Sequence, residues 1–219
     1  MKRNSEKIFT GRIYGTIASF LSVCLVLVVV SCGEDDGVTG PETTTMDLVY
    51  EGWDLFEDAE YAAALEYFER ALQASGDLTD DQRMYAYSGA GWTCGKLPGR
   101  LEDARDYFEQ SVIDSMMLYD ALAGWLFVDY QLGDWNLALL KAEVLMADIP
   151  TWRFYHEETL DYNDIRLLMA ASHFNLGNFS ESLQVVVEHL NSSFEADIST
   201  QQGRRELSEE IERLREVYG

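Results

Sequence analysis

The stretch Leu132-Gly133-Asp134-Trp135, with Ala138 three residues further on, decides the fold because altered copies of it occur along the chain. Each copy places a tight polar turn between two segments with apolar residues at helical spacing, which predicts two helices joined by a turn. The other copies are Leu176-Gly177-Asn178-Phe179 with Ser182, Ala59-Glu60-Tyr61 with Ala64, and the weaker set Leu101, Ala104 and Phe108.

The small residue in each copy gives the period of the repeat. It stands at positions 64, 104, 138 and 182, so the gaps are 40, 34 and 44 residues. A gap of 34 residues is the period of a helix-pair repeat, and the longer gaps indicate the same unit with short insertions. Because one helix pair cannot close a core alone, we expect the pairs to stack and to present a surface rather than a catalytic pocket.

The copies resemble tetratricopeptide (TPR) repeats, in which a Gly-Asp-Tyr turn precedes a small residue, an aromatic residue and an alanine. Repeat 1 matches with Tyr61, Ala64, Phe68 and Ala71, whereas repeat 3 has Ala142 in place of the aromatic residue. The resemblance implies an all-α fold, a right-handed α-solenoid of about four helix pairs. We expect the repeats within 46–198, over about 45–78, 82–118, 119–152 and 163–196.

The N-terminus resembles the signal peptide of a bacterial lipoprotein. A basic start precedes the almost wholly apolar residues 13–30, and Val29-Val30-Ser31-Cys32 resembles a lipobox. The resemblance implies cleavage between Ser31 and Cys32, loss of 1–31 as the signal peptide, and attachment of acyl chains such as palmitate at Cys32. The alternative is an uncleaved anchor, because the 18 residues from 13 to 30 are just long enough to span a bilayer.

Residues 32–45 are polar and small and lack an apolar period, which predicts a flexible, disordered tether. Two or more acyl chains anchor a protein durably. We therefore expect the repeat body to be secreted across the inner membrane and lipid-anchored in the cell envelope. Because residue 33 is Gly rather than Asp, the resemblance to enterobacterial sorting implies the outer membrane, with the body facing the periplasm.

Residues 199–219 predict a final helix with one apolar stripe. The stripe consists of Leu207, Ile211, Leu214 and Tyr218, which are spaced at helical intervals, and charged residues cover the remainder. A helix of this kind closes the open end of a helical stack, so we expect a capping helix. The alternative is a partner-binding helix.

Charge excludes one class of partner. The chain has 16 Lys and Arg against 39 Asp and Glu, and the part after residue 31 carries a net charge near −26. Nucleic-acid binding depends on Lys and Arg contacts with phosphate, so we expect no nucleic-acid partner. A basic protein or peptide would be attracted, although solubility alone also explains the acidity. The oligomeric state is not predicted.

The cysteines allow no internal disulfide. Cys24 leaves with the signal peptide and Cys32 is acylated, so Cys94 stands alone. We expect Cys94 to be a small packing residue in repeat 2, with a reactive thiol as the alternative.

The sequence contains no catalytic constellation, so it predicts a protein that is not an enzyme and needs no cofactor. His156-Glu157-Glu158-Thr159-Leu160 begins like the helix of a zinc protease, but Leu160 replaces the second histidine and no metal site is expected. The acidic clusters lack the glycine and closing Glu of a calcium loop. Paired carboxylates acting on peptidoglycan or another glycan stay an alternative, because spacing alone does not exclude them.

The TPR resemblance implies that the first helix of each pair lines a concave groove. The predicted partner-binding residues on these helices are Trp53, Phe56, Glu57, Trp92, Phe127, Tyr130, Gln131 and Phe174. A line of aromatic residues edged with acids suits an extended peptide or an amphipathic helix. The alternative is that the rings pack between the helices as core.

The connection Ile149-Pro150-Thr151-Trp152-Arg153-Phe154-Tyr155-His156 is about ten residues longer than the repeat requires. We expect it to add packing, with a recognition loop as the alternative. Together the patterns predict a lipid-anchored scaffold of the cell envelope that binds protein or peptide partners. An assembly factor resembling the TPR lipoproteins of the outer-membrane barrel-insertion machinery is a specific alternative, and homo-oligomerisation is another.

Overall fold

The computed structural model describes residues 43–112 and 119–218, and every regular element in this part of the chain is helical. The predicted signal peptide, the cleavage site at Ser31 and Cys32, and the tether up to residue 42 lie outside the described residues. None of the helices that are described is long and apolar enough to cross a bilayer.

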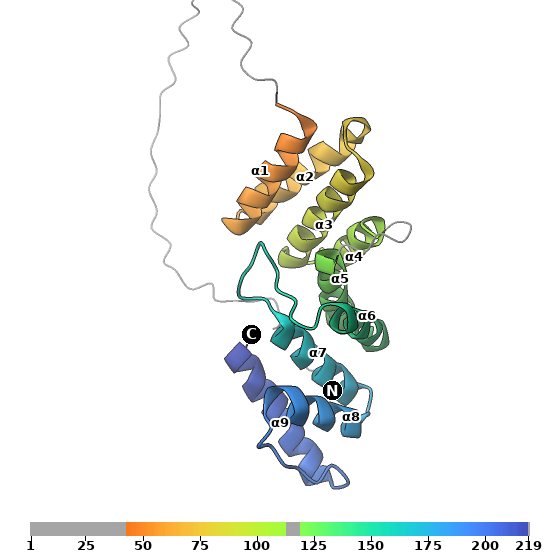
Figure 1. The fold of residues 1–219 in the computed structure, drawn as a ribbon, viewed down its shortest axis with the longest axis vertical. Helices are drawn as coiled ribbons and strands as arrows, with labels where there is room; N and C mark the ends of the chain where they lie inside the picture. Colours follow the sequence, from red (N-terminus) through yellow and green to blue (C-terminus); the bar gives the residue numbers. More distant parts are fainter. Residues whose placement is uncertain (1–42, 113–118, 219) are drawn as a thin grey trace, which may run out of the picture.

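The helices pack as consecutive antiparallel pairs along the long axis of the molecule (Figure 1). Within the four pairs each helix contacts the next along the chain, and the first helices of successive pairs also contact one another. The pairs are α1 (Thr45–Glu57) with α2 (Tyr61–Gln73), α3 (Asp80–Lys96) with α4 (Leu101–Gln110), α5 (Tyr119–Leu132) with α6 (Trp135–Asp148), and α7 (Tyr162–Asn175) with α8 (Phe179–Val185). A short 3-10 turn, η1 (Ser75–Asp77), precedes α3, and a π-turn, η2 (Val186–Leu190), extends α8. The prediction of an all-α, TPR-like solenoid is therefore confirmed.

Three of the first helices begin at capping boxes, which fix where each pair starts. The side chains of Thr44, Thr79 and Asp161 accept hydrogen bonds from backbone N–H groups of the first turns of α1, α3 and α7. In each case the third helical residue returns a hydrogen bond to the cap residue. These reciprocal bonds satisfy N–H groups that have no partner inside a helix.

The turns inside pairs 1, 3 and 4 share one geometry. A residue with positive φ follows the first helix in each turn: Ala59 at 61°, Gly133 at 87° and Gly177 at 81°. The next N–H donates to the carbonyl five residues earlier, as in Asp134 to Asp129 at 2.9 Å. This is the Schellman arrangement, which favours glycine at the left-handed position. Ala59 is the exception among the three.

Replacing Ala59 by Gly is expected to raise the free energy of unfolding by about 1 kcal/mol, because a left-handed conformation strains a residue that has a Cβ atom. Gly133→Ala should lower it by a similar amount for the same reason. Urea denaturation of both variants measures the two changes. Equal stability of Ala59→Gly and the parent chain would contradict the strain at this turn.

The core of pairs 1 and 2 depends on phenylalanines set against glycines. A Cβ atom on Gly52 of α1 or Gly89 of α3 would lie within 3 Å of the Phe68 ring. Gly91 of α3 and Gly124 of α5 bear the same relation to Phe108. Phe68 and Phe108 are both fully buried. Each ring of a second helix is thus seated between its own first helix and the first helix of the next pair.

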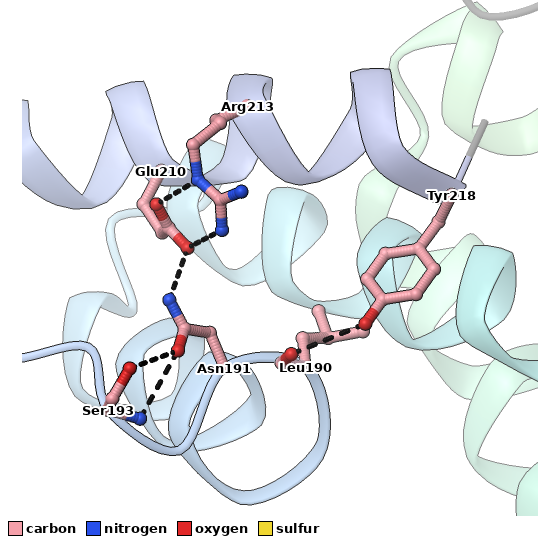
Figure 2. Close-up of polar contacts among 6 residues, drawn as sticks. All are labelled: Leu190, Asn191, Ser193, Glu210, Arg213 and Tyr218. Atoms are coloured by element: carbon pink, nitrogen blue, oxygen red, sulfur yellow. Dashed lines mark hydrogen bonds and ion pairs between the residues drawn. The ribbon is translucent and has the colours of Figure 1, made fainter.

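The last helix, α9 (Gln201–Tyr218), covers the end of the stack. Leu207, Ile211 and Leu214 of its predicted stripe are buried in a cluster with residues of α7 and η2. Figure 2 shows the polar contacts beside this cluster: Glu210 accepts from Asn191 Nδ2 at 2.8 Å and pairs with Arg213. The Arg213 hydrogen bond lowers the pKa of Glu210. This helix therefore has the capping position expected from the sequence.

Candidate functional site

The long connection between α6 and α7, residues 149–161, is called the strap here. In Figure 1 it is the teal loop that runs from α6 to α7 and extends toward the ends of α1 and α3. Its side chains alternate in exposure: Trp152 and Phe154 are buried, whereas Arg153 is 66% and Tyr155 80% exposed. The alternation indicates an extended segment with one face against the helices and one face toward solvent.

Three inward side chains of the strap contact three different first helices. Trp152 Nε1 donates to Asp120 Oδ1 of α5 at 2.8 Å. The Phe154 ring stacks on Trp92 of α3, with 4.1 Å between centroids. The His156 ring stacks on Trp53 of α1, with 3.7 Å between centroids and 8° between planes. The strap thus crosses the inner faces of pairs 3, 2 and 1 in that order.

Polar contacts hold the far end of the strap. His156 Nδ1 lies 2.7 Å from Glu57 Oε1, and His156 Nε2 lies 2.7 Å from the Tyr85 hydroxyl. Because the Glu57 carboxylate accepts, the neutral ring carries its proton on Nδ1 and accepts from Tyr85 at Nε2. Lys96 Nζ also donates to Glu157 Oε2 at 2.5 Å.

Hydrogen bonds join Glu57, His156 and Tyr85, which are residue types found in proton relays. The surroundings of these side chains do not favour proton transfer. Burial raises the pKa of the Tyr85 hydroxyl well above its usual range, so this group is no activated nucleophile. The imidazole is also covered, with a side chain only 6% exposed. The arrangement therefore orders the strap rather than activating a reacting group.

Lowering the pH through 6.5 is expected to weaken strap docking. Burial lowers the pKa of His156, while the Glu57 hydrogen bond and the nearby Asp120 and Asp54 carboxylates oppose part of that shift. A histidine whose folded pKa is depressed contributes stability above its unfolded pKa of about 6.5, and this stability is lost as the pH falls below that value. Tryptophan fluorescence between pH 8 and 5 reports the change, because Trp53 stacks on His156.

A His156→Asn variant isolates this contribution. Asp120 and Asp164 titrate in the opposite sense, because burial raises the pKa of both carboxyl groups, that of Asp164 to about 6. Their contribution is largest at low pH and is lost as the pH rises through the folded pKa. The difference between the parent chain and His156→Asn removes the Asp164 term and leaves the contribution of His156 together with its coupling to Asp120. A pH-independent difference would contradict the assignment to His156.

Four of the predicted groove aromatics are buried in the core, and Trp53, Phe56 and Trp92 among them contact rings of the strap. Trp53, Phe56, Trp92 and Phe127 are buried, with no more than 4% of any side chain exposed, and all four belong to the main core cluster. Their burial agrees with the alternative reading of these rings as core. They therefore offer no surface to a partner while the strap is in place.

The other predicted partner-binding residues are spread over the stack. Glu57 is exposed and pairs with His156. Tyr130 is half-buried, and its hydroxyl accepts from Arg215 of α9 at 3.3 Å. Gln131 is half-buried, and Phe174 packs against Phe179 with 5.1 Å between centroids. The structure thus brings Trp53, Phe56 and Trp92 into the main core cluster, whereas Phe174 packs against the second cluster, toward α9, and Tyr130 packs against both.

A buried ion-pair network joins pairs 2 and 3 on the other side of α5. Asp129 is fully buried, and its Oδ2 accepts from Lys141 Nζ of α6 at 2.6 Å. Arg105 of α4 lies 3.1 Å from Asp129 Oδ1, as an ion-pair contact without hydrogen-bond alignment, and also contacts Asp134. One carboxylate thus offsets two cations that come from different helices.

Asp129→Asn is expected to lower the free energy of unfolding by about 2 kcal/mol, because the partly buried Arg105 and Lys141 lose their shared negative charge. Glu102→Gln is the matched control, since Glu102 is 73% exposed and lies 3.7 Å from Arg105. We expect the control to change stability by less than about 0.5 kcal/mol. Thermal unfolding of both variants measures the two changes in stability. Equal losses of stability in Asp129→Asn and Glu102→Gln would contradict the role of the buried carboxylate.

Cys94, in the described part of the chain, is not a reactive site. Burial raises the pKa of the Cys94 thiol to about 12, so the group stays protonated and packs as a small core residue. Among the described residues, no group of three His, Cys, Asp or Glu side chains is placed to hold a metal ion.

Sequence comparison finds no match: no family model matches the chain, and no curated protein matches it significantly. Structural comparison finds a tetratricopeptide repeat protein from Parabacteroides merdae ATCC 43184, solved at 2.39 Å resolution. The two are 14% identical with a TM-score of 0.56, and the match covers 81% of this chain and 62% of that protein. This chain therefore spans less than two thirds of the length of that protein. At this identity the likeness shows a TPR-like fold and nothing finer.

Proposed function

We propose that the protein is a non-enzymatic, lipid-anchored scaffold of the bacterial cell envelope that binds a protein partner. The observation that carries the proposal is the TPR-like stack of helix pairs closed by α9, since a stack of this type typically presents surfaces for protein contacts. The lipobox-like residues at Ser31 and Cys32 support the anchor and the envelope location.

The charge of the exposed surface of α1 supports a basic segment as the partner. α1 contains four acidic residues and no Lys or Arg. Glu51 and Asp54 are exposed, and Tyr50 is 56% exposed beside them. Tyr155, at the end of the strap next to His156, is 80% exposed. Exposed tyrosine rings among carboxylates favour Lys and Arg side chains through charge and cation–π contacts.

Acylation is tested by producing the full chain in a bacterial host supplied with a palmitate analogue that can be tagged. We expect the chain to be labelled and to sediment with membranes, and Cys32→Ser to lose the label. Cys94→Ser is the control and should keep the label. An unlabelled parent chain that still sediments with membranes would favour the uncleaved anchor.

The partner is tested by cross-linking the full chain in intact envelopes and identifying the captured proteins. Glu51→Lys with Asp54→Lys should abolish capture of a basic partner. Glu66→Lys with Glu109→Lys is the matched control, because it makes the same charge change at exposed positions of the second helices α2 and α4. Capture that is equal for both double variants, or no captured protein at all, would reject the proposal.

A further inference from the structure

We infer that the strap is a built-in occupant of a peptide-binding surface on α1, α3 and α5. Undocking of the strap uncovers a site for an extended segment of a partner. This segment has aromatic residues at the positions of Trp152 and Phe154 and a basic residue at the position of His156. The inference rests on the proposed scaffold function and names the chemistry of the partner segment. It starts from the way in which residues 152–156 lie across the three helices.

The strap is seated on the helices as a peptide ligand would be. Trp152, Phe154 and His156 point inward at every second position, and each contacts a different helix pair. The intervening Arg153 and Tyr155 are exposed to solvent. Extended peptides are commonly recognised in this way, with every second side chain contacting the binding surface at a separate place.

The strap can leave without breaking the helices, because side chains alone hold it to α1, α3 and α5. The N–H of Ile149 donates to Leu145 of α6 at 2.8 Å, where the strap begins. The other backbone hydrogen bonds of strap N–H groups are internal: Trp152 to Ile149 at 3.1 Å, Phe154 to Leu160 at 3.0 Å, and Leu160 to Glu157 at 2.9 Å. Among the described residues, no backbone hydrogen bond joins the strap to those three helices. Undocking therefore breaks ring contacts, the polar contacts of Trp152, His156 and Glu157, and the apolar packing of the strap against the main core cluster.

The strap leaves one buried polar group unsatisfied, which a ligand in trans can satisfy. Trp53 is buried under His156, and its indole N–H has no hydrogen-bond partner in the described part of the chain. A segment that places an acceptor there gains a hydrogen bond that the strap does not make.

The charge around His156 indicates which residue of an incoming segment would occupy its place on α1. The neutral imidazole offers Glu57 one hydrogen bond, and Asp54 forms no ion pair among the described residues. A Lys or Arg at the same place pairs with both carboxylates. The aromatic positions of the incoming segment must still match Trp152 and Phe154, because otherwise the uncovered rings of Trp53 and Trp92 stay in water.

The test titrates a labelled synthetic peptide of residues 149–161 onto the full-length chain and follows fluorescence anisotropy. The triple variant Trp152→Ala, Phe154→Ala, His156→Ala empties the surface and is expected to bind the peptide at least tenfold more tightly than the parent chain. The matched control is Arg153→Ala, Tyr155→Ala, Glu158→Ala, which removes outward side chains of the same strap. It should bind as weakly as the parent chain.

Hydrogen exchange on the unaltered chain gives a second readout that does not depend on a variant folding. We expect the Trp152 indole N–H, whose hydrogen bond to Asp120 of α5 breaks on undocking, to be protected from exchange at least tenfold less than the slowest backbone amides of α3, which would show that the strap opens by itself. Exchange of this indole N–H only through global unfolding would reject the inference, because the strap would then be permanent core. So would a helical triple variant that binds the peptide no better than the parent chain. Neither readout uses an envelope partner, so a failure here is separate from a failure of envelope capture.

Discussion

Replacing Phe154 by Ala is expected to lower the free energy of unfolding by about 3 kcal/mol, because it removes a fully buried ring and leaves a cavity. Phe154 is 1% exposed and stacks on Trp92, whose ring is itself fully buried. Its ring also lies within about 6 Å of those of Trp53 and Phe56, edge to face. Truncating it therefore removes contacts with α1 and α3 at once.

Tyr155→Ala is the matched control for Phe154→Ala, because the neighbouring ring is 80% exposed. Its loss should change stability by less than about 0.5 kcal/mol. Guanidinium denaturation followed by tryptophan fluorescence compares the two variants, since Trp92 senses the strap directly. Equal stabilities would mean that the strap contributes no packing to the stack.

Hydrogen exchange in Phe154→Ala distinguishes a strap that opens by itself from a strap that opens only when the core unfolds. If the strap opens as a unit, Phe154→Ala speeds hydrogen exchange of the strap amides and leaves the α3 amides little changed. If the strap is inseparable from the core, both sets change together. The internal backbone hydrogen bonds of the strap favour the first pattern.

The stacking of the helix pairs could be predicted from the sequence because its determinants are local. Gly133 and Gly177 mark turns with positive φ, and the small residues Ala64, Ala104, Ala138 and Ser182 are all fully buried, as the repeat pattern requires. Ala59 occupies the same kind of turn without glycine, and only its position within the repeat indicated it.

The groove could not be assigned from the repeat pattern alone. The pattern assigns Trp53, Phe56 and Trp92 to first helices, where the structure also has them, but it does not say what covers these side chains. The strap of the same chain covers these side chains, and its His156 is about one hundred residues from Glu57 in the sequence. The alternation of aromatic and outward residues from Trp152 to His156 was the available signal, since alternation inside a connection indicates an extended segment with a buried face.

The residues that anchor the strap and the buried network carried no sequence signal. Tyr85 and Lys96 contact His156 and Glu157 only because the strap crosses α3. Asp129 is similar: an acid late in a helix usually faces water, and here Arg105 and Lys141 meet it from two other helices. Such pairs depend on packing between repeats, which one sequence does not reveal.

Gly124→Ala is expected to lower the free energy of unfolding by about 3 kcal/mol, at the upper end of the usual cost of overpacking. A Cβ atom there would lie 2.2 Å from Phe108 Cζ and 2.9 Å from Trp92 Cε2. Both rings are fully buried, so neither has room to move. Alanine is favoured over glycine inside a helix by about 1 kcal/mol, and the steric term outweighs that gain.

The matched control is Gly76→Ala, because a Cβ atom on Gly76 meets nothing within 4 Å. Its stability should stay within about 0.5 kcal/mol of the parent chain in urea denaturation. Shortening the opposing ring should rescue the clash: Phe108→Leu in the Gly124→Ala background is expected to cost at least about 1 kcal/mol less than the sum of the two single changes. Strict additivity would contradict contact between the two positions. A rescue would show that position 124 requires glycine because the Phe108 ring occupies the space of a Cβ atom. The same steric relation holds between Phe68 and the glycines at 52 and 89.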